Sequence, residues 1–117
     1  MSRSYLDFVA SLPCCITDMY SHQYESVVAH HIKGYSLGGT ASKCSNFMTI
    51  PLSQKNHLQL HSKGHEWWEN KYGKQIDYVV ETLRYAIRSN NININELKYD
   101  ISQIKNEDVL EKLRWIV

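Results

Sequence analysis

The sequence predicts one α+β domain in which two short strands and a helix form a core that further helices extend. A length of 117 residues suits one hydrophobic core rather than two. Residues 28–61 carry four of the six histidines and run in order through a β-branched segment, a Gly-rich loop, a short apolar segment and a helix. After residue 73, apolar residues recur at helical spacing. We therefore expect a single domain over 1–117, with the strand–strand–helix core at 13–65 and a helical extension at 66–117.

Local residue preferences give the expected elements. In chain order they are a helix or ordered arm at 4–12, an extended segment at 14–17, a polar hairpin loop at 18–26, a strand at 25–32, a long loop at 33–45, a strand at 47–52, a helix at 54–62, a helical turn or two at 66–72, an amphipathic helix at 74–89 and two short helices after an Asn-rich break. A loop as long as the one before the second strand is usually functional or tightly anchored in a small domain.

Breaking and capping residues set the first boundaries. Pro13 ends the first helix, because proline disfavours the helical conformation of the residue before it. Val27 and Val28 are β-branched and favour the first strand. Pro51, near the end of the second strand, suits an edge or terminal position. Ser53 is placed to cap the helix that follows.

Glycines and apolar spacing define the later helices. Gly64 and Gly73 are placed to end the helices that precede them. The helix that follows is the clearest, because its apolar residues fall at i, i+3, i+4, i+7 and i+11. These residues are Ile76, Val79, Val80, Leu83 and Ile87.

The composition excludes several classes of protein. No apolar run approaches the roughly 18 residues that span a bilayer, and residues 1–10 lack the apolar core of a secretory signal. We therefore expect a cytoplasmic protein without a membrane partner. A net charge of +1 is too small for a strongly basic nucleic-acid binder. The 3 cysteines are an odd number and too few for a disulfide scaffold.

The histidines have the spacing of a metal centre. On a helix, His57 and His61 lie one turn apart on the same face, so both imidazoles can bind one ion. His30 lies across the predicted hairpin and would supply a third ligand. Three imidazoles with one open position are the arrangement of a catalytic rather than a structural site. His31 need not bind the ion, and an imidazole can take a proton from water at neutral pH.

Other polar side chains have a functional and a plainer interpretation. Lys33, Lys43 and Lys55 are candidate contacts to phosphate, and solvated lysines are the alternative. His22 and His65 are expected at the surface, and His65 is also a candidate contact to substrate phosphate. A histidine pair at helical spacing alone is also found in cores and on surfaces. The adjacent histidines, the loop and the second strand are what favour a metal site.

Two adjacent tryptophans follow the histidine helix. Trp67 and Trp68 are candidates for stacking on bases. Such a pair more often divides, so we expect one ring to pack against the core and the other to be partly exposed.

Three segments match the pieces of a known nuclease family in order. They are V-A-H-H-I at 28–32, S-N-F-M-T-I-P-L at 45–52 and N-H-L-Q-L-H at 56–61. In this the chain resembles the HNH, or ββα-metal (His-Me finger), endonucleases, which include the nuclease domains of bacterial colicins. L-P-C, A-H-H-I-K-G, G-G-T-A-S-K, T-I-P-L and H-L-Q-L-H followed by W-W-E-N-K-Y-G-K-Q resemble more closely a phage-encoded HNH family related to the recombination-enhancement nuclease (Ref). The similarity covers roughly residues 10–88.

The resemblance implies a role for each matching residue. His30, His57 and His61 would hold one divalent metal ion. His31 would be the general base, and Asn46 would brace the loop and thereby orient that base. The ion would be zinc, nickel, manganese or magnesium, of which magnesium suits imidazoles least because it prefers oxygen ligands.

One departure from the family concerns a second metal. Related phage proteins often carry two Cys-x-x-Cys pairs that bind a structural zinc. The corresponding positions here are Cys14 with Thr17 and Ser53 with Asn56, so one cysteine of four is present. We therefore expect no structural zinc, and the helices after residue 73 to supply the missing core.

The resemblance implies a metal-dependent DNA endonuclease that nicks DNA or cuts it with low specificity during phage or prophage DNA recombination or processing. The expected partners are DNA and a recombination or replication protein. The chain is expected to be a monomer or homodimer in the cytoplasm of a bacterial host or a phage-infected cell.

Two alternatives remain open. One is a non-catalytic DNA-binding or recombination-accessory module that retains the fold and the metal, and the near-neutral charge keeps it open because it favours a partner protein that delivers the DNA. The other is a structural zinc domain that uses Cys14 or Cys15 with the histidines. An intact His31 with Asn46 favours the enzyme, since a binding module has no use for a general base.

Overall fold

The computed structural model describes residues 4–35 and 45–116. Its elements are α1 (Tyr5–Ala10), β1 (Val27–His31), β2 (Thr49–Ser53), α2 (Gln54–Lys63), α3 (His65–Tyr72), α4 (Gln75–Arg88), α5 (Ile94–Ser102) and α6 (Glu107–Leu113). The domain is therefore α+β, as expected, and the order strand, strand, helix is the predicted one. Most of the expected loop at 33–45, with Lys43 and Cys44, lies outside the described residues.

The strands form a two-stranded antiparallel sheet. Val27 pairs with Ser53 and His31 pairs with Thr49. Pro51 was expected near a strand end but lies at the centre of β2, opposite Ala29. Proline is tolerated there because a strand of a two-stranded sheet is an edge strand, as the sequence predicts. The carbonyl of Pro51 still accepts a hydrogen bond from the backbone N–H of Cys15 at 2.9 Å.

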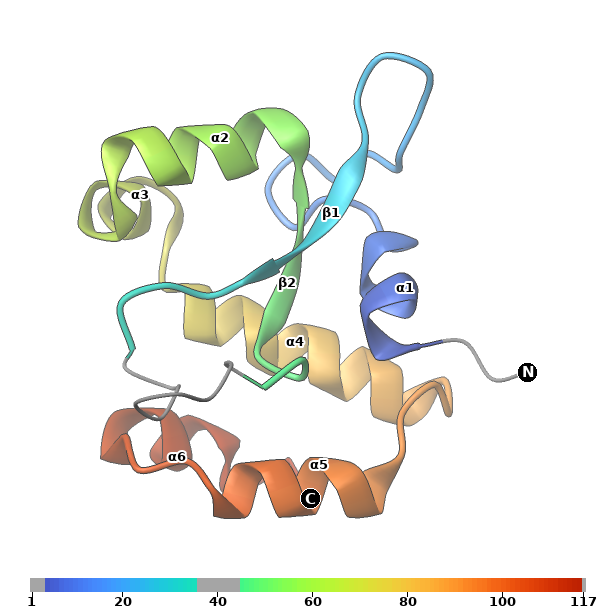
Figure 1. Cartoon of the computed structure of the whole chain (residues 1–117), viewed down its shortest axis with the longest axis vertical. Coiled ribbons are helices and arrows are strands. Elements are labelled where there is room, and N and C mark those ends of the chain that lie inside the picture. Colours follow the sequence, from blue (N-terminus) through green and yellow to red (C-terminus); the bar gives the residue numbers. More distant parts are fainter. Residues whose placement is uncertain (1–3, 36–44, 117) are drawn as a thin grey trace.

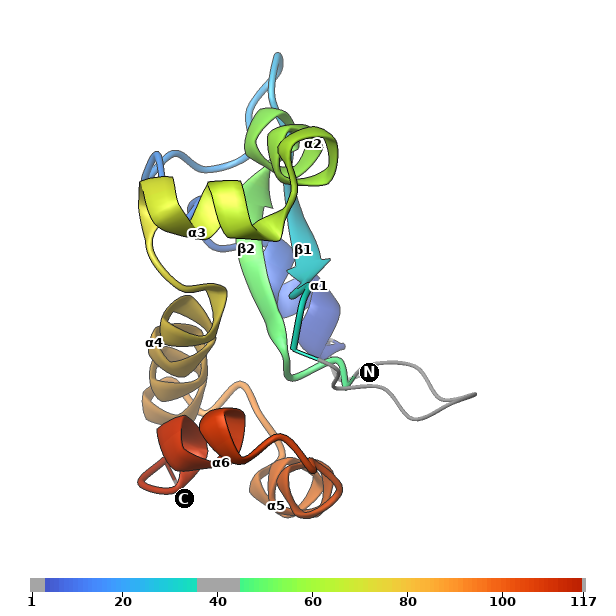
Figure 2. The same ribbon diagram turned by 90° about the vertical axis from the view of Figure 1, so that its left-hand side faces the viewer.

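Helices cover both faces of this small sheet. Figure 2 shows β1 and β2 between α1 on one side and α4 on the other. Both strands contact α1, and β2 also contacts α4. Helix α2 crosses the end of the sheet and packs against α3, while α5 and α6 lie at the opposite end (Figure 1). The core between these layers includes the fully buried side chains of Met48, Ile50, Leu52, Leu60, Trp68 and Leu83.

Local capping explains where the helices start and stop. Ser53 is the last residue of β2 and the N-cap of α2, where its side chain accepts a hydrogen bond from the N–H of Asn56 at 3.3 Å. Gly64, with φ of +92°, ends α2 and lets α3 begin at once, one residue earlier than expected. The predicted caps at Ser53, Gly64 and Gly73 are confirmed.

The segment before the first strand differs from the prediction. Residues 14–17 were expected to be extended, but they form a turn in which the N–H of Asp18 donates to the carbonyl of Cys14 at 2.8 Å. Beyond it, the predicted hairpin loop is confirmed, since His22 and Glu25 exchange backbone hydrogen bonds in an isolated bridge. Within the described ranges, every helix is too short or too polar to cross a membrane.

Candidate metal centre

Three imidazoles from two separate segments converge in the structure. His30 comes from β1, and His57 and His61 come from successive turns of α2. One nitrogen from each ring lies within 4.8 Å of those of the other two. The ring centroids are 5.1 Å apart for His30 and His57, 5.9 Å for His30 and His61, and 4.5 Å for His57 and His61. The rings meet edge to face rather than stacking, which is the arrangement of ligands around a common point.

The sheet and the capping residue hold this geometry. His30 pairs with Ile50 in the sheet, and its side chain is 1% exposed. Because Ser53 both ends β2 and caps α2, the helix leaves the sheet without a flexible linker. Leu60 buries one face of α2 against the core. These constraints bring the helix histidines to the strand histidine as the sequence predicts.

Burial makes two of the three rings favour the neutral form that a metal requires. Burial lowers the pKa of His30 to about 4, although the hydrogen bond that its ring donates to Gln75 acts in the opposite direction. Burial also lowers the pKa of His57, and the nearby positive charges of His61 and Lys33 add to the effect. At neutral pH both rings therefore keep a lone pair for a ligand.

An orphaned nitrogen supports the fit of an ion. Nδ1 of His57 is buried and has no hydrogen-bond partner among the described residues. A buried polar atom without a partner is unfavourable, and a metal ligand is a common reason for one. Three imidazoles leave a coordination position open for water or substrate. The donor set suits zinc, nickel or manganese better than magnesium.

His31 projects away from the triad and pairs with the turn before β2. Its Nε2 lies 3.0 Å from Oδ1 of Asn46. Because a carbonyl oxygen can only accept, this contact puts the ring proton on Nε2 and leaves the lone pair on Nδ1. The hydrogen bonds that hold the turn around Asn46 include those from Thr49 Oγ1 to the carbonyl of Asn46 at 2.8 Å and from Ser45 Oγ to Asp100 at 2.6 Å.

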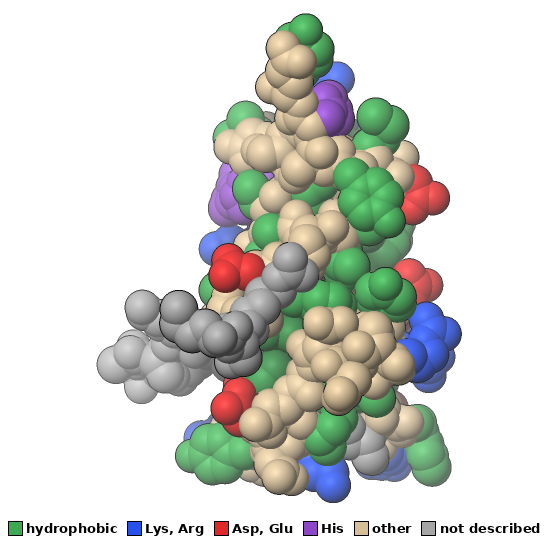
Figure 3. Space-filling model, turned by 90° about the vertical axis from the view of Figure 1, so that its right-hand side faces the viewer, with side chains coloured by type: hydrophobic (Ala, Val, Ile, Leu, Met, Phe, Trp, Pro, Cys, Tyr) green, Lys and Arg blue, Asp and Glu red, His purple; other side chains and the backbone are tan. Residues whose placement is uncertain are grey.

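The candidate phosphate contacts do not all gather at the triad. Lys33 is exposed and close enough to lower the pKa of both His30 and His57. Lys55 is also exposed but lines a separate small hollow beside the hairpin loop. Figure 3 shows histidine side chains in the upper part of one face, each beside a lysine or arginine. Positive charge thus lies near this end of the molecule.

The two other histidines have different environments. His22 is exposed, as expected, and its Nδ1 accepts the N–H of Tyr24 at 3.3 Å. His65 is half-buried rather than freely solvated, since its ring lies directly over Gly34. A Cβ atom at position 34 would come within 2.4 Å of that ring. The ring therefore locks α3 against the segment that follows β1.

The tryptophan pair divides as predicted. Trp68 is fully buried, and Trp67 is 38% exposed. The ammonium groups of Lys63 and Lys71 lie 5.8 and 5.2 Å from the centroid of the Trp67 ring. This aromatic surface between two cations has the composition that single-stranded nucleic acid prefers.

A polar network behind His30 has no counterpart in the sequence prediction. Gln75, the first residue of α4, is fully buried and bonds His30, the backbone of Lys33 and Glu69. Glu69 also accepts hydrogen bonds from the hydroxyl of Tyr35 and the backbone N–H of Gln75. A signal was present, because Gln75 is a polar residue on the mostly apolar buried face of an amphipathic helix.

Cys14 and Cys15 lie outside the histidine cluster. Burial raises the pKa of the Cys14 thiol, but hydrogen bonds from Thr17 and from the backbone of Ser53 outweigh it and the net shift is downward. Nδ2 of Asn56 in turn donates to Ser53 Oγ at 3.0 Å. Cys14, Thr17, Ser53 and Asn56 therefore lie together. Across the described residues, the cluster that suits a metal contains histidines alone.

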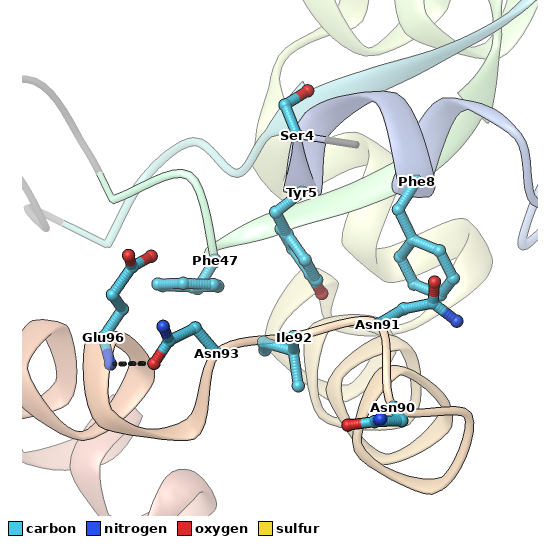
Figure 4. Close-up of a pocket in the computed structure, with 9 residues that line it drawn as sticks. All are labelled: Ser4, Tyr5, Phe8, Phe47, Asn90, Asn91, Ile92, Asn93 and Glu96. Carbon is cyan, nitrogen blue, oxygen red and sulfur yellow. Dashed lines mark hydrogen bonds between the residues drawn. The ribbon is translucent and has the colours of Figure 1, made fainter. Parts of the chain in front are cut away.

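One described hollow lies away from the histidines. It has a volume of about 600 Å³ and lies between the start of α1 and the connection from α4 to α5, where Figure 4 shows Tyr5, Phe8, Phe47 and a run of asparagines around it. A neighbouring hollow includes Asn46, together with the carboxylates of Glu96 and Asp100. These acidic groups disfavour phosphate, so the hollow is not a candidate path for the DNA backbone.

Together, the fold and the site define an α+β domain with a three-histidine cluster that suits a metal ion. The chain belongs to the family described as "Protein of unknown function (DUF968)", whose model matches residues 1–89. It is similar to "Uncharacterized protein YdfU" of Escherichia coli (strain K12), with 26% identity over 87 residues. That match covers 74% of this chain and 23% of the relative. No solved structure matches the chain. Helices α5 and α6 lie beyond the residues that the family model matches.

Proposed function

We propose that the protein is a metal-dependent DNA endonuclease of the HNH (ββα-metal) superfamily, close to the phage-encoded family related to the recombination-enhancement nuclease. The observation that carries the proposal is the convergence of His30, His57 and His61 beside a separate pair formed by His31 and Asn46. A structural metal site needs only the three histidines of the triad. A hydrolytic site needs the triad and also the pair of His31 and Asn46, because the ion and the base act on different atoms.

In this proposal β1, β2 and α2 are the ββα-metal core, and α3 to α6 extend it. The sequence resemblance to the phage-encoded family extends over roughly residues 10–88. The antiparallel strands β1 and β2, followed directly by helix α2, have the order of elements that the superfamily uses. The proposed activity is nicking or low-specificity cutting during phage or prophage DNA recombination or processing.

Each residue has a distinct task in phosphodiester hydrolysis. Nδ1 of His31 takes a proton from the attacking water, while Asn46 holds the ring in the tautomer and orientation that this transfer needs. His30, His57 and His61 would hold the cation through imidazole nitrogens. When bound, the cation supplies positive charge that stabilises the additional negative charge on the phosphate and the departing oxygen. Lys33 contributes a further positive charge near the triad.

The alternative is a DNA-binding accessory module without catalysis. The net charge of +1 favours it, because a weakly charged protein relies on a partner to bring it to DNA. The same consideration makes a recombination or replication protein a proposed partner of the enzyme. The feature that distinguishes the enzyme from the accessory module is the general base, His31, which a DNA-binding module does not require.

A plasmid assay tests the proposal. Supercoiled plasmid is incubated with wild type and with His31→Ala in the presence of Mg²⁺, Mn²⁺, Ni²⁺ or Zn²⁺, and the metal content of both proteins is measured. We expect wild type to nick the plasmid with at least one metal and EDTA to abolish the nicking. His31→Ala should retain the metal and lose the activity. Equal activity of the two proteins, or inactivity of wild type with every metal, would contradict the proposed nuclease activity.

A further inference from the structure

The side chain of Gln75 is a fully buried amide whose hydrogen-bonding capacity is completely used. Its Oε1 accepts from the backbone N–H of Lys33 at 3.1 Å and faces Nε2 of His30 at 2.9 Å. Its Nε2 donates to the carbonyl of Lys33 at 2.9 Å and to Glu69 at 3.3 Å. An amide side chain has two donor hydrogens and two acceptor lone pairs, so no capacity is left over.

These partners fix which way the amide points. If the amide were flipped, its NH₂ group would face the N–H of Lys33, and its oxygen would face the carbonyl of Lys33 and the carboxylate of Glu69. Two donors would then meet at one end and three acceptors at the other, around an amide that is itself fully buried. The oxygen of Gln75 therefore faces His30.

The orientation of the amide dictates the state of the histidine. An oxygen that only accepts requires a proton on Nε2 of His30. In a neutral imidazole, Nδ1 then carries the lone pair. We propose that Gln75 is a positioning residue that fixes His30 in the Nε2–H tautomer and so presents Nδ1 to a divalent cation. This inference deepens the proposed function, because it rests on the histidine triad as the metal site.

Glu69 and Tyr35 make Gln75 a fixed support. The carboxylate of Glu69 accepts from the backbone N–H of Gln75 at 2.8 Å and from the hydroxyl of Tyr35. The carbonyl of Tyr35 accepts from the side chain of Asn106, the N-cap of α6, at 2.8 Å. The network therefore joins the first metal-ligand strand to α3, α4 and α6. Partners of this kind, which hydrogen-bond the far nitrogen of a ligating histidine, orient the ring and strengthen metal binding.

The tautomer of His30 is measurable without metal or activity. Two-bond ¹H–¹⁵N correlation spectra of the metal-free wild type at pH 7.5 distinguish the two nitrogens of each ring. We expect Nε2 of His30 to be protonated and Nδ1 to be unprotonated. The opposite tautomer in wild type would overturn the inference, even if every variant failed to fold.

The variant Gln75→Met tests the link to metal binding. It removes the acceptor at nearly constant volume, so both tautomers of His30 become accessible. We expect a mixture of the two in the spectra and a Zn²⁺ affinity reduced by about 10- to 100-fold, measured by competition with a chromophoric chelator. Unchanged Zn²⁺ affinity in folded Gln75→Met would overturn the inference.

One further variant separates positioning from general destabilisation. Thr82→Val removes another buried polar group of α4, one that bonds only the carbonyl of Tyr78 within its own helix. It should leave the tautomer and the Zn²⁺ affinity as in wild type. A fall in the Zn²⁺ affinity of folded Thr82→Val as large as that of Gln75→Met would count against the inference.

Failure of this inference and failure of the nuclease are distinguishable. If the plasmid stays intact while the tautomer and Zn²⁺ affinities follow expectation, the positioning role of Gln75 is supported and the nuclease activity is contradicted. If wild type nicks DNA but His30 carries its proton on Nδ1, the nuclease activity is supported and the positioning role of Gln75 is contradicted.

Discussion

Nε2 of His31 lies 3.0 Å from Oδ1 of Asn46, and 15 positions of sequence separate the two residues. The hairpin brings them together, because His31 ends β1 opposite Thr49 and Asn46 lies in the turn just before β2. His30, the neighbour of His31, faces α2. Adjacent residues of a strand project to opposite sides, so one strand end presents one imidazole toward α2 and the next toward Asn46.

Asn46→Ala tests this pairing. Without the amide, the His31 ring can rotate and exchange tautomers, so we expect the plasmid-nicking rate to fall by about 10- to 100-fold. Zn²⁺ affinity should not change, because the triad is intact. The matched control is Asn95→Ala. Asn95 is an exposed asparagine of α5 that lines the same surface hollow as Asn46, and this variant should nick at the wild-type rate. Equal rates for the two variants would contradict a role for Asn46.

Zn²⁺ should stabilise the folded chain through the triad. At a free concentration about 100 times its Kd, a ligand of the native state adds about 2.7 kcal/mol to the free energy of unfolding, which corresponds to a rise in Tm of about 10 °C here. His61 is exposed, so His61→Ala should fold normally and lose most of this rise. His22→Ala, which alters an exposed histidine of the hairpin loop, should keep it. A full rise in His61→Ala would place the ion elsewhere.

The metal-free protein should lose stability in mild acid because of His30. Its pKa is about 4 in the folded chain and near 6.5 when unfolded. The unfolded state therefore binds more protons between these values, and stability falls as the pH decreases from about 6.5 to about 4. The full loss is on the order of 3 kcal/mol, and the lowered pKa of His57 acts in the same direction.

Denaturant unfolding at pH 7.0 and 4.5 in EDTA measures this loss. Carboxylates also titrate in this range, but they contribute equally to wild type and to His30→Leu. We expect the variant to lose about 2–3 kcal/mol less than wild type between the two pH values, and His22→Ala to behave as wild type. Equal losses in wild type and His30→Leu would show that His30 is not buried in the neutral form.

Local signals in the sequence were enough to predict most of the elements. Ser53, Gly64 and Gly73 act through their own backbone and side chain, and each lies where a cap was expected. The turn at 14–17 could not be predicted in this way. Its backbone bonds run to Met19 and to Pro51, and Pro51 is brought there by the sheet. Long-range hydrogen bonds decided the conformation of this segment, and they leave no periodic pattern.

The same distinction separates the parts of the candidate site. His57 and His61 could be paired from helical spacing, and the hairpin accounted for His30. Gln75 lies 45 positions after His30, on a helix that no motif connects to it. Its partnership depends on how α4 packs against the sheet. Spacing thus predicted which histidines lie together, while the contact with Gln75 emerged only from the packing.

Trp67 is expected to contribute to DNA binding. Its ring is partly exposed between Lys63 and Lys71, so a base can stack on it while the lysines meet phosphate. Stacking contributes about 1–3 kcal/mol per base, so Trp67→Ala should weaken binding to a single-stranded oligonucleotide by about 10-fold in fluorescence anisotropy. Trp115→Ala is the control, since Trp115 is 79% exposed and follows α6, which lies at the opposite end of the molecule from α2 and α3 (Figure 1). If both variants bind as wild type does, DNA does not reach this surface.

Gly34 and Gly64 provide a matched pair for the contact between His65 and the segment after β1. Their φ angles are +91° and +92°, so alanine at either position strains the backbone by about 1–3 kcal/mol. At Gly64 a Cβ would meet open space, whereas at Gly34 it would lie 2.4 Å from the His65 ring. We therefore expect Gly34→Ala to destabilise the protein more than Gly64→Ala does, by about 1–3 kcal/mol, in denaturant unfolding. The double variant Gly34→Ala/His65→Ala removes the clash, and relative to His65→Ala alone the added alanine should cost only as much as Gly64→Ala. Equal destabilisation by the two single glycine variants would mean that the ring moves aside freely and does not lock α3 in place.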